Sequence, residues 1–97
     1  MSKWLVERRL SESAERLKRV RAEIQVADEQ LRSLADAADD ARLRALVSET
    51  PLAEQEHREA QRHADAMARH RSELEAEVRL LQQSQDELLD RLARELG

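Results

Sequence analysis

Apolar and small side chains recur every seven residues on both sides of Pro51. Such a heptad repeat is typical of the seam of a coiled coil. When the repeats are paired outward from the centre, the residue numbers of each pair add to 98. The pairs are Ala45 with Ala53, Ala38 with Ala60, Leu31 with Met67, Ile24 with Leu74, Leu17 with Leu81, and Leu10 with Leu88. The pattern therefore predicts an all-α fold, an antiparallel two-helix coiled-coil hairpin in which one chain folds back on itself.

A second set of positions gives the same register, because its pairs also add to 98. The pairs are Val6 with Leu92, Ser13 with Gln85, Val20 with Val78, Ala27 with Arg71, Leu34 with Ala64, and Ala41 with His57. We interpret Ser13 and Gln85 as a polar layer that fixes the register at some cost in stability. We expect the stem of Arg71 to cover Ala27 while its guanidinium reaches water.

The segment Ser48-Glu49-Thr50-Pro51 predicts the boundary between the two helices. The residue before a proline avoids the α region, and proline favours the first position of a helix. We therefore expect helices at about residues 2–47 and 51–96, a turn at 48–50, and Thr50 as the N-cap of the second helix. The whole chain, 1–97, is then a single helical hairpin domain. A continuous helix is disfavoured because an internal proline costs about 3 kcal/mol and because the heptad phase changes across Pro51.

The seam is rich in leucine toward the termini and rich in alanine toward the turn. Alanines let helices approach closely but bury little apolar area each. A hairpin of this length with one narrow seam is marginally stable, and small scaffolds of this kind are commonly stabilised by oligomerisation. We therefore expect two copies to self-associate into a four-helix arrangement.

Composition excludes several classes of protein. Charged residues make up 39% of the chain, and there is no Cys and only one Gly, which rules out disulfides, thiolate nucleophiles and glycine-rich phosphate loops. No apolar run is long enough for a membrane span, and the N-terminal residues lack the apolar stretch of a signal peptide. We expect a cytoplasmic protein, and the excess of Arg over Lys, 15 to 2, is typical of a bacterial source.

Opposite charges are concentrated near the two termini. Residues 1–21 hold seven Lys or Arg and three Glu, whereas residues 73–97 hold seven Asp or Glu and three Arg. These stretches lie side by side in an antiparallel hairpin, so their charges attract. The net charge is −4 and no aromatic platform accompanies the basic stretch, so we expect protein partners rather than nucleic acid.

Two groups of apolar residues lie off the predicted seam or at its ends. At the open end we expect a partner or oligomer interface made of Trp4, Leu5, Leu89, Leu92 and Leu96. Exposed apolar clusters mark interfaces, and tryptophan is enriched among binding hot spots. Near the turn we expect a second group to pack the turn, with partner contact as the alternative. The group comprises Leu43, Leu46, Val47 and Leu52, and the alternative contact with a partner adds Glu49.

The three histidines do not predict a metal site. His63 and His70 stand two helical turns apart, about 10 Å along the axis, which is too far for one ion. Glu54 and His57 match half of a di-iron Glu-x-x-His motif, but the other ligands are missing. No set of nucleophile, base and orienting residue can be assembled either. We therefore expect no catalytic residues, no cofactor and no metal.

These observations predict a non-enzymatic protein–protein interaction module, a coiled-coil adaptor, scaffold or regulatory subunit that acts through the open end, and a homodimer. One alternative is a probe. In architecture alone, the chain resembles transcription factors that insert a coiled-coil finger into the secondary channel of RNA polymerase. The acids near its tip are Asp39, Asp40, Glu49, Glu54 and Glu56. A third hypothesis is an export-apparatus or chaperone-like hairpin.

Overall fold

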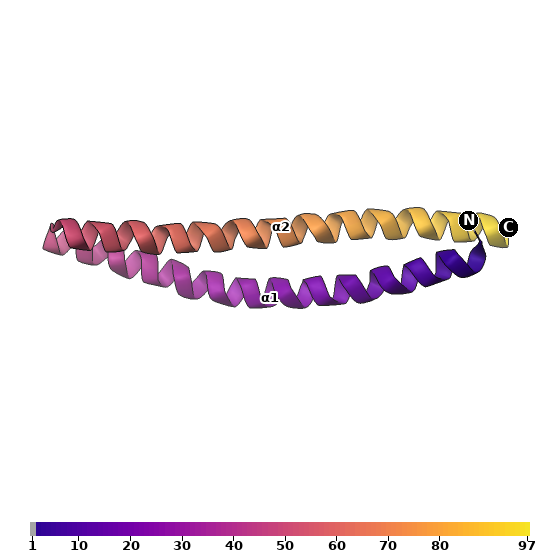
Figure 1. The fold of residues 1–97 in the computed structure, drawn as a ribbon, viewed down its shortest axis with the longest axis horizontal. Helices are drawn as coiled ribbons and strands as arrows, with labels where there is room; N and C mark the ends of the chain where they lie inside the picture. The colour runs from indigo at the N-terminus through magenta and orange to yellow at the C-terminus, as the bar shows by residue number, and fades with distance from the viewer. Residues whose placement is uncertain (1) are drawn as a thin grey trace. The chain divides into compact units, whose positions relative to one another are not determined.

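The computed structural model describes residues 2–97, and this part of the chain is helical without strands. Helix α1 spans Lys3–Ser48 and helix α2 spans Pro51–Leu96. The chain reverses direction between them, so that α1 and α2 form a helical hairpin (Figure 1). The predicted all-α hairpin is confirmed, and a continuous helix through Pro51 is excluded. The four-helix arrangement stays a prediction.

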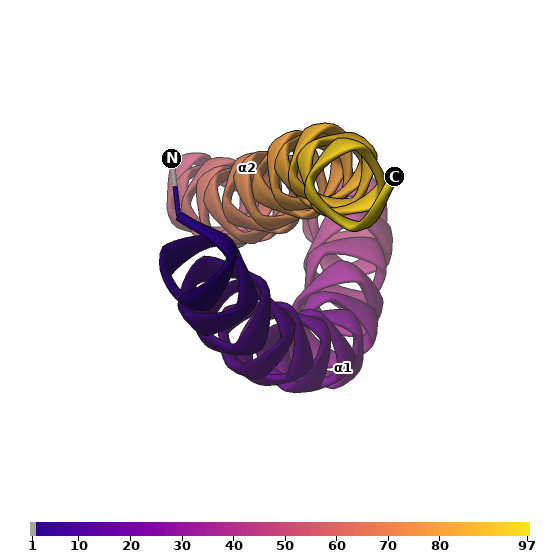
Figure 2. The same cartoon turned by 90° about the vertical axis from the view of Figure 1, so that its right-hand side faces the viewer.

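The hairpin packs as two units. The terminal unit consists of Met1–Ile24 and Glu73–Gly97, and the turn unit consists of Gln25–Ser72. Within the terminal unit, the first turns of α1 lie beside the last turns of α2 (Figures 1 and 2). Within the turn unit, the second half of α1 packs against the first half of α2.

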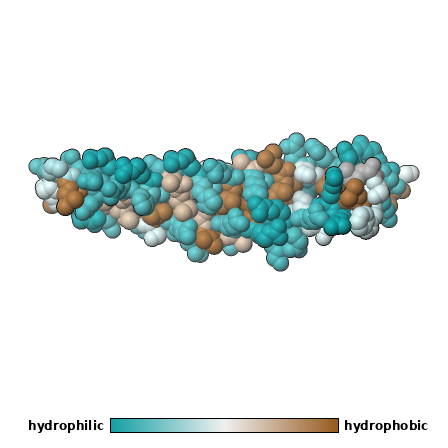
Figure 3. Space-filling view, viewed as in Figure 1, coloured by the Kyte–Doolittle hydropathy of each residue, from teal (hydrophilic) through white to brown (hydrophobic). Residues whose placement is uncertain are grey.

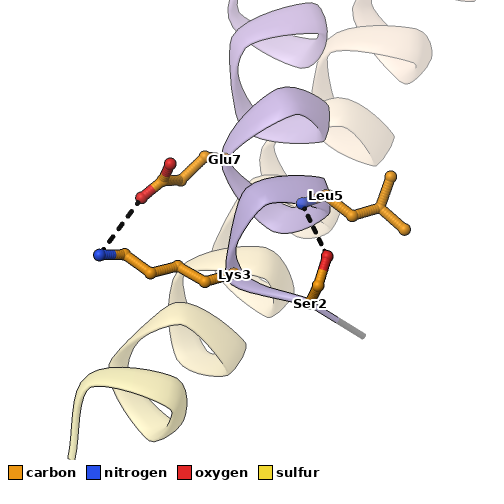
Figure 4. A network of polar contacts seen from close by, with 4 residues as sticks. All are labelled: Ser2, Lys3, Leu5 and Glu7. Atoms are coloured by element: carbon orange, nitrogen blue, oxygen red, sulfur yellow. Dashed lines mark hydrogen bonds and ion pairs between the residues drawn. The ribbon is translucent and has the colours of Figure 1, made fainter.

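Helix α1 begins one residue later than expected because Ser2 is its N-cap. The Leu5 backbone N–H donates to Ser2 Oγ at 3.2 Å, and the Val6 N–H donates to the Ser2 carbonyl at 3.0 Å. Figure 4 shows this first turn, with Lys3 and Glu7 on one side of the helix and Leu5 on the other. Lys3 Nζ lies 3.9 Å from Glu7 Oε1. A serine hydroxyl in this position satisfies a backbone donor that the helix itself cannot pair.

The turn is closed by Glu49 and Thr50. Glu49 has a φ of 53°, the left-handed conformation that often ends a helix, and its N–H donates to the Ala45 carbonyl at 3.0 Å. Thr50 Oγ1 then accepts the Ala53 N–H at 3.2 Å. The prediction that Thr50 caps α2 is confirmed.

Burial follows the predicted seam. Every buried residue within 2–97 occupies a predicted seam position, and none of those positions from Val6 to Leu92 is exposed. The buried residues of the two units differ in size. They are Val6, Ser13, Leu17, Val20, Leu74 and Leu88 in the terminal unit, and Ala27, Ala38, Ala41, Ala53 and Ala64 in the turn unit. The turn unit therefore buries less apolar area per layer, as the sequence predicts.

Two polar seam residues differ in the partners of their side chains. The Arg71 side chain is 33% exposed, and its Nε donates to Asp28 Oδ1 on α1, an ion pair that the heptad pattern did not predict. Ser13 Oγ is buried and has no hydrogen-bond partner among the described residues, so no hydrogen bond joins the Ser13 hydroxyl to Gln85 in the predicted polar layer. Ionic contacts beside the seam also link the two helices. In one of them, Arg16 lies 2.6 Å from Glu77 Oε1.

Candidate functional site

Five apolar side chains at the termini form the first candidate site, which we call the terminal surface. Trp4 is 64% exposed, Leu89 and Leu96 are also exposed, and Leu5 and Leu92 are half-buried. All five belong to the terminal unit. A tryptophan with that exposure does not seal the end of the hairpin, so its apolar ring is free for a partner.

The heptad positions divide this surface. Leu89 and Leu96 occupy e positions of α2, and Trp4 occupies a b position of α1, which lies next to the e flank. Leu5 lies on the opposite flank of α1, and Leu92 continues the seam opposite Val6. The part of the terminal surface that faces away from the core is therefore built around Trp4, Leu89 and Leu96.

Arg8 belongs to the terminal surface although the pattern of apolar residues did not reveal it. Its guanidinium carbon lies 5.5 Å from the centroid of the Trp4 ring, within the range of a cation–π interaction. Its Nε also donates to Glu12 Oε1 at 3.1 Å. The i, i+4, i+8 spacing of Trp4, Arg8 and Glu12 is the sequence signal for this arrangement. Glu12 holds Arg8 over one face of the indole, so the ring is partly fixed in place.

The second candidate site lies at the turn and comprises Leu43, Leu46, Val47 and Leu52, which we call the turn surface. All four side chains are exposed, and Val47 reaches 86%. Hydrophobic atoms are visible at the turn end of the molecule in Figure 3. The expectation that these residues pack the turn is therefore wrong. Glu49, the acidic residue of this group, is exposed as well.

A groove runs along one flank of the turn unit, and sequence reasoning missed it. Two adjoining hollows of about 390 and 510 Å³ share Leu34 and His63 in their walls. The remaining lining residues are Ala37, Ala41, Arg44, Glu56, Glu59, Ala60, Arg62, Ala66 and Met67. The sequence signal was the pair Ala37 and Ala66, small residues that stand off the seam and widen its alanine stripe.

A smaller hollow of about 310 Å³ lies on the other flank of the turn unit. Three of its six lining residues are charged, Arg42, Glu54 and Arg58, and half-buried His57 lies among them with Leu46 and Ala45. His57 stands near Glu54 there, but within residues 2–97 no three His, Cys, Asp or Glu side chains are grouped so that they can hold a metal ion. His63 and His70 are exposed.

The side-chain hydrogen bonds of the described residues are of two kinds. In the described chain the side-chain hydrogen bonds join acidic groups to arginines or glutamines, or cap a helix. None of them couples a hydroxyl to a histidine, the pairing that activates a nucleophile. The distinctive features of the surface are its exposed apolar side chains and the groove.

Comparison with other proteins assigns the chain to no family. No protein-family model, no curated protein and no solved structure matches the chain. Neither α1 nor α2 has a stretch that is apolar and long enough to cross a lipid bilayer. Any assignment of function must therefore be argued from the surfaces described above.

Proposed function

We propose that this chain is a non-enzymatic protein–protein interaction module, an adaptor, scaffold or regulatory subunit, that acts through the terminal surface. Its partner there is a second copy, so that two hairpins associate into a four-helix arrangement. The observation that carries the proposal is the exposure of Trp4, Leu89 and Leu96 on a unit whose seam is already filled. Exposed clusters of this kind on small proteins usually mark interfaces.

The energetics favour Trp4 as the centre of this contact. A buried indole is among the largest single contributions at protein interfaces, commonly about 2 kcal/mol or more. Arg8 and Glu12 restrict the ring before binding, which lowers the entropy lost on association. Leu89 and Leu96 add apolar area on the same flank, and a dimer compensates for the narrow seam of a single hairpin.

The test uses sedimentation velocity together with tryptophan fluorescence. Trp4 is the only tryptophan, so its emission reports on the terminal surface alone. We expect the wild type to sediment above the 11.2 kDa of one chain and its emission to shift to the blue as concentration rises. Leu96→Ala should weaken the shift, and Trp4→Ala should raise the dissociation constant of this contact about 30-fold.

Leu80→Ala is the matched control. Leu80 is 67% exposed and belongs to the terminal unit, but it stands apart from the terminal surface in sequence. Its substitution should leave both readings unchanged. Emission that does not change with concentration would contradict the proposal. Such a result would favour one of the alternatives. If the chain is a probe, charge reversal at Glu49 in its acidic tip abolishes activity; if it is an export-apparatus or chaperone-like hairpin, it binds unfolded or secreted clients reversibly.

A further inference from the structure

One face of the turn unit carries both large exposed apolar side chains and the groove. Val47 and Leu52 occupy c positions of their helices, and position c lies next to position g on a helix. The groove runs along the g flank, where Ala37, Arg44 and His63 line it. Val47 and Leu52 therefore stand beyond the turn end of the groove, on the same side of the unit.

The two parts of this face are complementary in size. Four of the eleven residues that line the groove are alanines, Ala37, Ala41, Ala60 and Ala66, and their small side chains leave space that larger ones would occupy. Val47 and Leu52 are large, apolar and exposed. Interfaces between helices are stable when large side chains of one element enter spaces left by small side chains of the other.

The charges of the face are balanced as well. Two arginines and two glutamates line the groove: Arg44, Arg62, Glu56 and Glu59. None of these four is in an ion pair within residues 2–97. Glu59 accepts a hydrogen bond from Gln55, but the face as a whole holds equal numbers of opposite charges. Two copies of such a face can meet without opposing surfaces of one sign.

We propose that this face is a second self-association site, in which Val47 and Leu52 of one copy fill the groove of another copy and receive the same contact in return. A two-fold axis that lies in the interface and crosses the helices at a right angle produces this reciprocal contact. Helix α1 of one copy then runs antiparallel to α1 of the other, and Val47 faces Ala37 of the partner subunit.

The proposal is independent of the terminal surface, because all the residues that carry it belong to the turn unit. It also gives Val47 and Leu52 of the turn surface a specific binding partner, the groove of a second copy. A contact made through Val47 and Leu52 does not use the tryptophan, so a variant that loses association at the termini keeps this one.

The test is disulfide cross-linking, for which the chain is suited because it has no native cysteine. Val47→Cys and Ala37→Cys are prepared separately, mixed in the Trp4→Ala background and oxidised mildly. We expect covalent heterodimers joined between positions 47 and 37. Residues 47 and 37 of one helix stand about 15 Å apart, whereas a disulfide requires Cα atoms within about 7 Å. For the same reason, neither variant should cross-link when it is oxidised alone.

Val26→Cys mixed with Ala37→Cys is the control. Val26 is 53% exposed in the same unit, but it lies outside the proposed contact, so it reports random collision. Cross-linking of Val47→Cys no greater than this control would overturn the proposal, and so would efficient cross-linking of Val47→Cys with itself. Because Trp4 is absent from the experiment, either result leaves the function proposed for the terminal surface unaffected.

Discussion

Two polar residues at seam positions, Arg71 and Ser13, reach opposite outcomes. Arg71 has a long side chain, and its Nε reaches the Asp28 carboxylate beside the seam. Ser13 has a short side chain whose hydroxyl stays buried and unbonded. Burial of an unbonded hydroxyl is unfavourable, whereas a charge that reaches a partner near solvent is tolerated. Side-chain length, rather than polarity, decides which residue fits the seam.

We therefore expect Ser13→Ala to raise the free energy of unfolding by about 1 kcal/mol, because it removes an unsatisfied hydroxyl and adds helix propensity. Chemical denaturation followed by circular dichroism measures the effect. Ser11→Ala changes an exposed serine of the same helix and isolates the gain from propensity. If Ser11→Ala stabilises the protein as much as Ser13→Ala, the buried hydroxyl costs nothing.

At the scale of the helices, the ends are set by three side chains. Ser2 and Thr50 cap α1 and α2 through their hydroxyl oxygens, and Pro51 begins α2 where its missing N–H costs nothing. Glu49 differs from these, because a residue with a Cβ is strained in the left-handed conformation that it adopts. The start of α2 is thus well capped, whereas the backbone at Glu49, just after α1, is strained.

Replacing Glu49 by glycine should relieve this strain. Glycine adopts the left-handed conformation without steric penalty, although it also makes the unfolded chain more flexible. We expect Glu49→Gly to raise the free energy of unfolding by about 0.5–1 kcal/mol, measured by urea denaturation. Glu49→Ala removes the carboxylate but keeps the Cβ, so it should give no such gain. Equal stabilisation by both variants would assign the effect to charge rather than to backbone conformation.

The elements and the seam were predictable because each depends on spacing along the chain. A heptad repeat decides which residues face the other helix, and Thr50-Pro51 decides where α2 begins. The ion pair between Arg16 and Glu77 was not predictable, because flexible side chains reach across the helices outside the layers that the pairing defines. The groove was not predicted either, because it forms where small side chains on one flank leave space beside the seam. Heptad spacing places Leu43 and Val47 at outward positions f and c, and both are exposed; the expectation that they pack the turn went against that spacing.

At the scale of the whole molecule, each of the two units has a different kind of core, and each leaves apolar side chains exposed. The terminal unit buries valines and leucines and exposes Trp4, whereas the turn unit buries alanines and exposes Val47. We propose that each leftover surface is self-complementary. A chain with two distinct sites of this kind links each copy to more than one other copy, provided that the same two copies do not satisfy both sites.

The proposal of two self-association sites is tested by the masses of four proteins: the wild type, two single variants and the double variant. We expect the wild type to form assemblies larger than a dimer, because both contacts operate. Trp4→Ala removes one contact and Val47→Asp the other, so each variant should stop at twice the 11.2 kDa of the chain. The aspartate acts by removing the apolar contact of Val47 with the groove and by placing there a charge that must give up its hydration. The double variant should be monomeric and still helical by circular dichroism. Light scattering over a range of concentrations measures all four, and a wild type no larger than either single variant would show that only one of the two surfaces associates.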